Sequence, residues 1–163
     1  MSSQPKLYNS IIKAGLLAGT LDIAAAIITH YIRFGKGPEG IFRYIARGAF
    51  GEAAKTGGTE YIIAGILFHY IIAFGFTILF FLVYPKIKRY VSPSIIIFGL
   101  TYGIIVWCIM NLVVVPSSKI IQAPLTLTSI TREMLILMCC IGLPIAIFAK
   151  RHYSATSHET YNN

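Results

Sequence analysis

The sequence predicts an all-α membrane protein with four transmembrane helices and one amphipathic interfacial helix between the first and the second. Composition is the first indication: of 163 residues, 56% are hydrophobic and only 12% are charged, about half the charged share of a soluble domain. The mean hydropathy of +0.71 agrees. The second indication is a set of four apolar runs, each near the roughly 20 residues that cross a bilayer as a helix. We expect one membrane domain, because the chain is short.

The four predicted spans cover residues of about 14–32, 61–84, 94–115 and 130–149. Proline marks their limits, because it lacks the backbone N–H that a helix interior needs. The second run ends at Pro85, the third stops before Pro116, and the fourth contains Pro144 and should bend. Runs rich in β-branched residues are helices too, since open strands cannot satisfy their backbone groups in lipid.

The ends of the chain are predicted to be tails, at residues 1–13 and 150–163, flanking a single membrane domain at 14–149. The first apolar run is too long for the core of a signal peptide and three similar runs follow it. We therefore interpret it as an uncleaved span.

The loop between the first two spans contains a predicted helix at about residues 38–54. Pro38 suits a first helical turn, and the charged side chains of Glu39, Arg43 and Arg47 recur every four residues opposite an apolar side. This spacing is typical of an amphipathic helix that lies on the membrane surface or folds back against the bundle. A solvated surface helix without a task is the alternative.

The formal net charge of +8 is predicted to serve membrane contact. Its basic residues lie mostly in short segments between apolar runs, where Lys and Arg meet lipid headgroups. No nucleic-acid-binding pattern is present, so we expect no nucleic-acid partner. The two sides of the membrane carry equal numbers of basic residues, but the compact cluster "PKIKR" at 85–89 favours cytoplasmic termini.

Polar residues inside the spans are predicted to form two tiers. Asp22 and His69 each lie about 12–13 Å from the same end of their antiparallel spans, and we expect them to turn inward and pair. Trp107 and Cys139 fall at a similar depth. The shallower tier comprises His30, Asn111, Arg132 and Glu133.

These tiers have two interpretations. A charged carboxylate at mid-membrane costs about 2.5–3.5 kcal/mol on insertion scales, so such residues are often functional. A site for a proton, an ion or a small polar solute is one interpretation. Structural hydrogen bonds that tie the four helices together are the other.

Five glycines are predicted to mark close helix packing. Gly15 and Gly19 form GxxxG in the first span, as do Gly99 and Gly103 in the third, and Gly65 shares a face of the second span with His69. Small residues at this spacing let helix backbones approach.

Catalysis, metal binding and cofactor binding are not indicated. The sequence contains no HExxH, GxSxG, P-loop or GxGxxG pattern. Its three cysteines lie in apolar runs without zinc-ligand spacing. Haem ligation by His30 and His69 is disfavoured because the two lie at different depths, about 12 Å apart along the normal.

The chain also resembles a family. The features that carry the resemblance are "GLLAGTLD" at 15–22, a histidine in the second span, "YPKIK" at 84–88 and a glycine-bearing third span. It is similar to small four-helix bacterial inner-membrane proteins of unknown function, of the YagU type. The resemblance implies a bacterial cytoplasmic membrane and four helices, and transfers no catalytic or binding residues.

The leading functional expectation is a small transport-type or channel-type protein whose polar site centres on Asp22 and His69. The alternative is an accessory or assembly subunit of a larger membrane complex, in which the polar residues are purely structural. Lipid is the expected environment, with a homo-oligomer or another membrane protein as partner.

Overall fold

The computed structural model describes residues 7–90, 94–121 and 124–161, and every regular element within them is a helix. The elements are, in chain order, α1 Leu7–Phe34, α2 Glu39–Phe50, α3 Ala53–Thr56, α4 Thr59–Tyr90, α5 Ile95–Ile109, the π-helix η1 Met110–Val114, α6 Leu127–Leu137, the π-helix η2 Met138–Gly142 and α7 Leu143–Tyr161. Four rods, α1, α4, α5–η1 and α6–η2–α7, are long and apolar enough to cross a membrane. The predicted fold class is confirmed.

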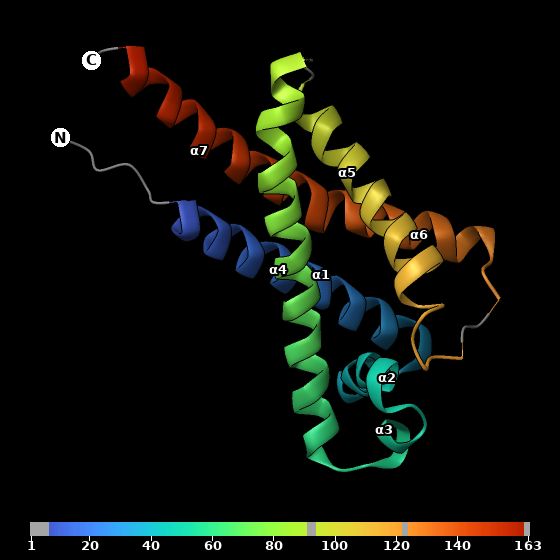
Figure 1. Ribbon diagram of the computed structural model, residues 1–163. Coiled ribbons are helices and arrows are strands. Elements are labelled where there is room, and N and C mark those ends of the chain that lie inside the picture. The colour runs from blue at the N-terminus through green and yellow to red at the C-terminus, as the bar shows by residue number, and fades with distance from the viewer. Residues whose placement is uncertain (1–6, 91–93, 122–123, 162–163) are drawn as a thin grey trace.

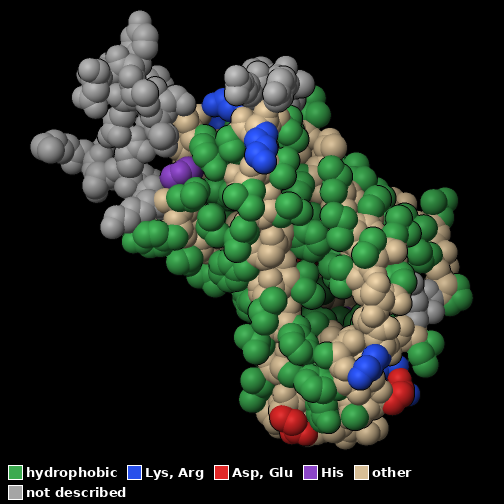
Figure 2. All heavy atoms as spheres, in the orientation of Figure 1, with side chains coloured by type: hydrophobic (Ala, Val, Ile, Leu, Met, Phe, Trp, Pro, Cys, Tyr) green, Lys and Arg blue, Asp and Glu red, His purple; other side chains and the backbone are tan. Residues whose placement is uncertain are grey.

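The rods place the loops at two ends of the molecule. Helix α1 and the α6–η2–α7 rod lie side by side and run in opposite directions, while α4 crosses them (Figure 1). The first turn of α1 lies at the same end as the last turns of α4 and α7; α2 and α3 lie at the other. The face in Figure 2 is apolar through its middle, with Lys and Arg side chains near both ends and acidic side chains near the end that carries α2 and α3. This is the distribution expected of a chain that spans lipid.

Helix ends differ from the prediction. Helix α1 begins at Leu7 and α7 continues to Tyr161, so much of both predicted tails is helical. Helix α4 continues through Pro85 to Tyr90. Proline has no N–H for the carbonyl four residues earlier, here that of Phe81. The Tyr153 hydroxyl of α7 donates to this carbonyl at 2.8 Å, which replaces the missing bond and joins α4 to α7.

The fourth rod accommodates Pro144 by a local change of helix type. Immediately before this proline the chain forms η2, in which the Leu143 N–H bonds to the Met138 carbonyl five residues back. The predicted bend therefore corresponds to a π-helical segment, a widening that often occurs at functional sites.

Glycines bring the helices to within backbone contact. Gly99 and Gly142 face one another, and Gly103 lies on the backbone of Met138, so α5 packs directly on η2. Between α1 and α4, Gly15 faces the ring of Phe74. All of these contacts are possible because glycine has no side chain.

Aromatic side chains form the core between α4 and α5 near the end of the molecule where α4 stops. Phe80 and Tyr102 meet edge to face with centroids 4.7 Å apart, and Phe98 packs on both Phe80 and Tyr84. The Tyr102 hydroxyl donates to the Phe76 carbonyl at 2.6 Å. The two helices are therefore joined by aromatic rings at this end.

The predicted loop helix is shorter than expected and folds back on the bundle. Helix α2 ends at Gly51, which adopts a φ of +64°, and α3 is a separate turn. The backbone of Phe42 crosses Gly65 of α4, and the Lys119 N–H donates to the Gly48 carbonyl at 3.0 Å. Of the two predicted placements, folding back is observed; a position in the lipid interface stays a prediction.

Candidate functional site

Three polar side chains from three rods lie near one another close to the middle of the membrane domain. Asp22 lies 15 residues from the start of α1 and 12 from its end, or about 18–22 Å from either end. His69 comes from α4 and Cys140 from η2. Asp22 is close enough to both for an electrostatic interaction. We call Asp22, His69 and Cys140 the central polar cluster.

His69 is buried and holds α4 against α1. Its Nε2–H donates to the Gly19 carbonyl at 2.8 Å, and only 9% of the residue is exposed. A carbonyl can only accept, so Nε2 carries a proton in this bond. When the imidazole is neutral, Nδ1 is its free acceptor.

Asp22 lies close to His69, yet the predicted direct bond between them is absent. Among the residues that the structure describes, Asp22 forms no hydrogen bond and no ion pair. The reason lies one turn earlier in α1. Gly19 packs against the side chains of Tyr70 and Ala73, and this approach is close enough for the imidazole to reach the Gly19 backbone.

Two further features near the depth of Asp22 and His69 were not predicted. Cys140 is partly buried and within electrostatic range of Asp22, whereas Cys139 is exposed. Trp107 is 6% exposed and its indole Nε1–H has no partner in the described chain. Depth alone placed Trp107 correctly in a span but could not show whether its N–H is bonded, because that depends on the neighbouring helices.

The predicted shallower tier does not form one cluster. His30 packs over Gly40 of α2 and beside the ring of Phe34, and its Nε2 has no partner within the described residues. Asn111 donates to the Trp107 carbonyl of its own rod at 3.2 Å. The structural interpretation had expected Asn111 to tie two helices together. Within the described residues its hydrogen bond stays inside its own rod.

Arg132 and Glu133, which are adjacent in sequence, form an ion pair with each other. Their nearest charged atoms lie 3.9 Å apart. Glu133 interacts with Tyr44 of α2: burial raises the pKa of the Tyr44 hydroxyl, the Glu133 carboxylate raises it further, and Arg47 opposes them. Arg47 forms an ion pair with Glu52. The interaction of Glu133 with Tyr44 thus links α6 to α2 at this end of the molecule.

The expected absence of a metal or haem stays a prediction. Within the described ranges, no group of three or more His, Cys, Asp and Glu side chains is placed to hold a metal ion. His69 bonds to α1 through Nε2, and His30 lies beneath α2.

Comparison with protein-family models, with curated proteins and with solved structures finds no match to this chain. The chain is a small membrane protein with four apolar spanning helices. Its resemblance to the YagU-type proteins stays a prediction, as do the bacterial inner membrane and the cytoplasmic position of the termini.

Proposed function

We propose that this protein moves protons or a small polar cation across its membrane by way of the central polar cluster, with Asp22 as the binding group. The observation that carries the proposal is the lack of any hydrogen bond or ion pair to Asp22 within the described chain, at a depth of about 18–22 Å along α1. An acidic side chain in a membrane span is a candidate for an ion or proton pathway.

The structural interpretation of the same residues is less well supported. If Asp22 tied helices together, its carboxylate would bond to a donor on another rod. Two other hydrogen bonds join α1 to α4 instead: His69 donates to the Gly19 carbonyl, and the Thr20 and Tyr70 hydroxyls lie 2.9 Å apart. The helices are joined without Asp22, so its carboxyl group is available to a ligand.

The imidazole gives Asp22 a neighbour for proton exchange. His69 Nε2 is held by Gly19, which leaves Nδ1 to accept and release a proton near the carboxylate. Histidine is a common proton shuttle in proteins. Proton exchange between Asp22 and His69 would leave the bond from His69 to the Gly19 carbonyl of α1 in place.

Proton flux in liposomes tests the proposal. The full chain, reconstituted in liposomes that contain a pH-sensitive dye, should dissipate an imposed proton gradient. Asp22→Asn should reduce the flux toward that of protein-free liposomes, because an amide cannot release a proton. Glu39→Gln is the matched control: it also replaces a carboxylate with an amide, but at an exposed residue at the start of α2, and should leave the flux unchanged.

Two outcomes would contradict the proposal. Wild-type flux equal to that of protein-free liposomes under gradients of protons, Na⁺ and K⁺ would remove the transport function. Unchanged flux in Asp22→Asn would remove Asp22 from the mechanism.

An accessory or assembly subunit is the second candidate. It is favoured by how little of each rod the chain itself covers: only 28% of the most apolar window of each span is buried. The remaining apolar surface is available to lipid or to another membrane protein. Gentle extraction followed by native mass spectrometry should detect a stoichiometric second protein; a bare chain or homo-oligomer would contradict this candidate.

A further inference from the structure

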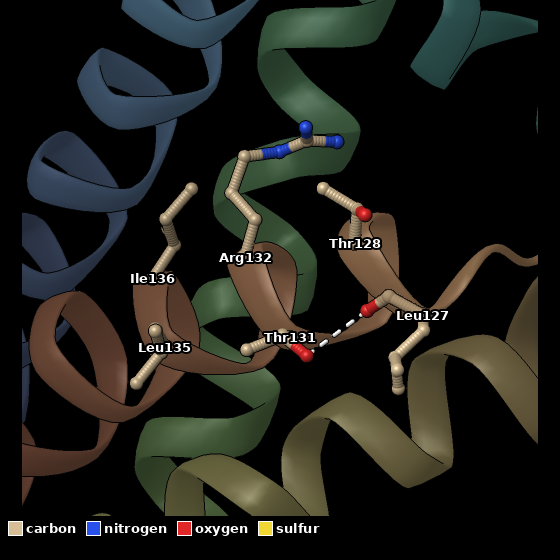
Figure 3. Close-up of a pocket in the computed structure, with 6 residues that line it drawn as sticks. All are labelled: Leu127, Thr128, Thr131, Arg132, Leu135 and Ile136. Atoms are coloured by element: carbon tan, nitrogen blue, oxygen red, sulfur yellow. Dashed lines mark hydrogen bonds between the residues drawn. The ribbon is translucent and has the colours of Figure 1, made fainter.

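A groove follows one side of α6, near the end of the molecule opposite the chain termini. Its volume is about 540 Å³, and it is lined by Leu127, Thr128, Thr131, Arg132, Leu135 and Ile136. These residues form two parallel rows with four-residue spacing, and the rows are visible in Figure 3. Thr128, Arg132 and Ile136 form one row; the other row consists of the remaining three. The lining is apolar except for two hydroxyl groups and one guanidinium group.

Arg132 supplies the charge of this groove. Its Nε is buried and has no hydrogen-bond partner among the described residues, while its Nη2 forms an ion pair with Glu133 at 3.9 Å. The six lining residues include one cation and no acid. A guanidinium matches the geometry of a phosphate group, so the groove is complementary to a phosphate-bearing anion.

The neighbouring polar groups suit the same ligand. Thr128 lies one turn before Arg132 in the same row, and its hydroxyl makes no hydrogen bond within the described chain. The Thr131 hydroxyl, by contrast, is used by its own helix and donates to the Leu127 carbonyl at 2.9 Å. The N-terminal end of α6, where backbone N–H groups favour negative charge, lies in the same turn as Thr128.

Depth indicates where the phosphate comes from. The rod from Leu127 to Ser154 has 28 residues, or about 42 Å, close to the roughly 40–45 Å of a bilayer with its headgroups. Arg132 lies five residues from the start of this rod, at about 7.5 Å. This is the level of lipid phosphates. Leu135 and Ile136, one turn deeper, are placed to contact acyl chains.

We propose that this groove is a binding site for an anionic phospholipid, with the lipid phosphate on Arg132 and Thr128 and an acyl chain along Leu135 and Ile136. The site is separate from the central polar cluster. A membrane lipid is favoured over a free anion because apolar side chains continue the groove toward the bilayer centre. Leu127 and Leu135 are 80% and 53% exposed and are free to contact lipid.

Titration of the detergent-solubilised full chain with phosphatidylglycerol, followed by native mass spectrometry, tests the proposal. Arg132→Gln should weaken phosphatidylglycerol binding about fivefold, as expected for one basic residue near an anionic surface, and should affect phosphatidylcholine less. Arg132→Lys should lie between the two, because it keeps the charge and loses the planar fork. Lys119→Gln is the control, since it removes an exposed charge from the same end of the molecule outside the groove.

Three results would overturn the proposal. Equal phosphatidylglycerol affinity in the wild type and Arg132→Gln would exclude Arg132 as the phosphate ligand. Displacement of the lipid by millimolar inorganic phosphate would identify a free-anion site. Lipid-free dimers that dissociate in Arg132→Gln would show that a second copy of the chain covers the groove.

Discussion

Replacing Gly65 with alanine would make a methyl group clash with the backbone of α2 at Phe42. A Cβ at this position would lie 2.6 Å from the carbonyl carbon of Phe42 and 2.9 Å from its Cα, and closer still to its carbonyl oxygen. Real Cβ atoms do not approach other atoms so closely, and a backbone cannot rotate away as a side chain can. The substitution therefore requires α2 to move off α4.

The size of this effect follows from the contact. Overpacking in a filled interior costs about 1–3 kcal/mol, and each kcal/mol lowers the unfolding midpoint by about 2–4 °C in a chain of 150–250 residues. We expect Gly65→Ala to lower the thermal unfolding midpoint in detergent by several degrees. Displacement of α2 should also expose the 35–58 segment to limited proteolysis.

Gly75 provides a control on the same helix. A Cβ at Gly75 would meet nothing within 4 Å, and alanine favours a helix over glycine by roughly 0.5–1 kcal/mol. Gly75→Ala should therefore leave the midpoint unchanged or raise it. An equal midpoint and equal protease resistance for Gly65→Ala and Gly75→Ala would refute the packing of α2 on α4.

Two further predictions concern tyrosine hydroxyl groups. Tyr153→Phe leaves the Phe81 carbonyl without a donor in an apolar setting and should destabilise the protein by about 1–3 kcal/mol in thermal or denaturant unfolding. Tyr84→Phe removes a hydroxyl that has no hydrogen bond in the described chain and should be nearly neutral. Equal effects of the two substitutions would contradict the role of Tyr153. Glu133→Gln should lower the raised pKa of Tyr44, because a negative neighbour is removed while burial remains. A ¹⁹F NMR titration of fluorotyrosine-labelled protein measures this pKa. An unchanged pKa would show that the Glu133 and Tyr44 side chains are not close.

The spans could be predicted because apolar length in lipid leaves few alternatives, but their ends could not. Helix α4 passes through Pro85 only because a hydroxyl from a residue far along the chain, Tyr153, replaces the missing N–H at the Phe81 carbonyl. No local pattern encodes such a bond. The same limitation applies to α2, whose amphipathic spacing predicts a helix but not the contact with Gly65 that determines its position.

The central polar cluster shows what depth can predict and what packing adds. Counting residues from the loop places Asp22 and His69 at one level, and the structure brings them near each other. Which acceptor the imidazole selects depends on how closely the two backbones approach, and Gly19 allows an approach that exposes its own carbonyl to His69. A side chain at this position would meet Tyr70 and Ala73 of α4 at 3.1–3.2 Å. Gly19 thus accepts a bond from α4 through its backbone carbonyl, while Asp22 has no hydrogen bond to any of the residues that the structure describes.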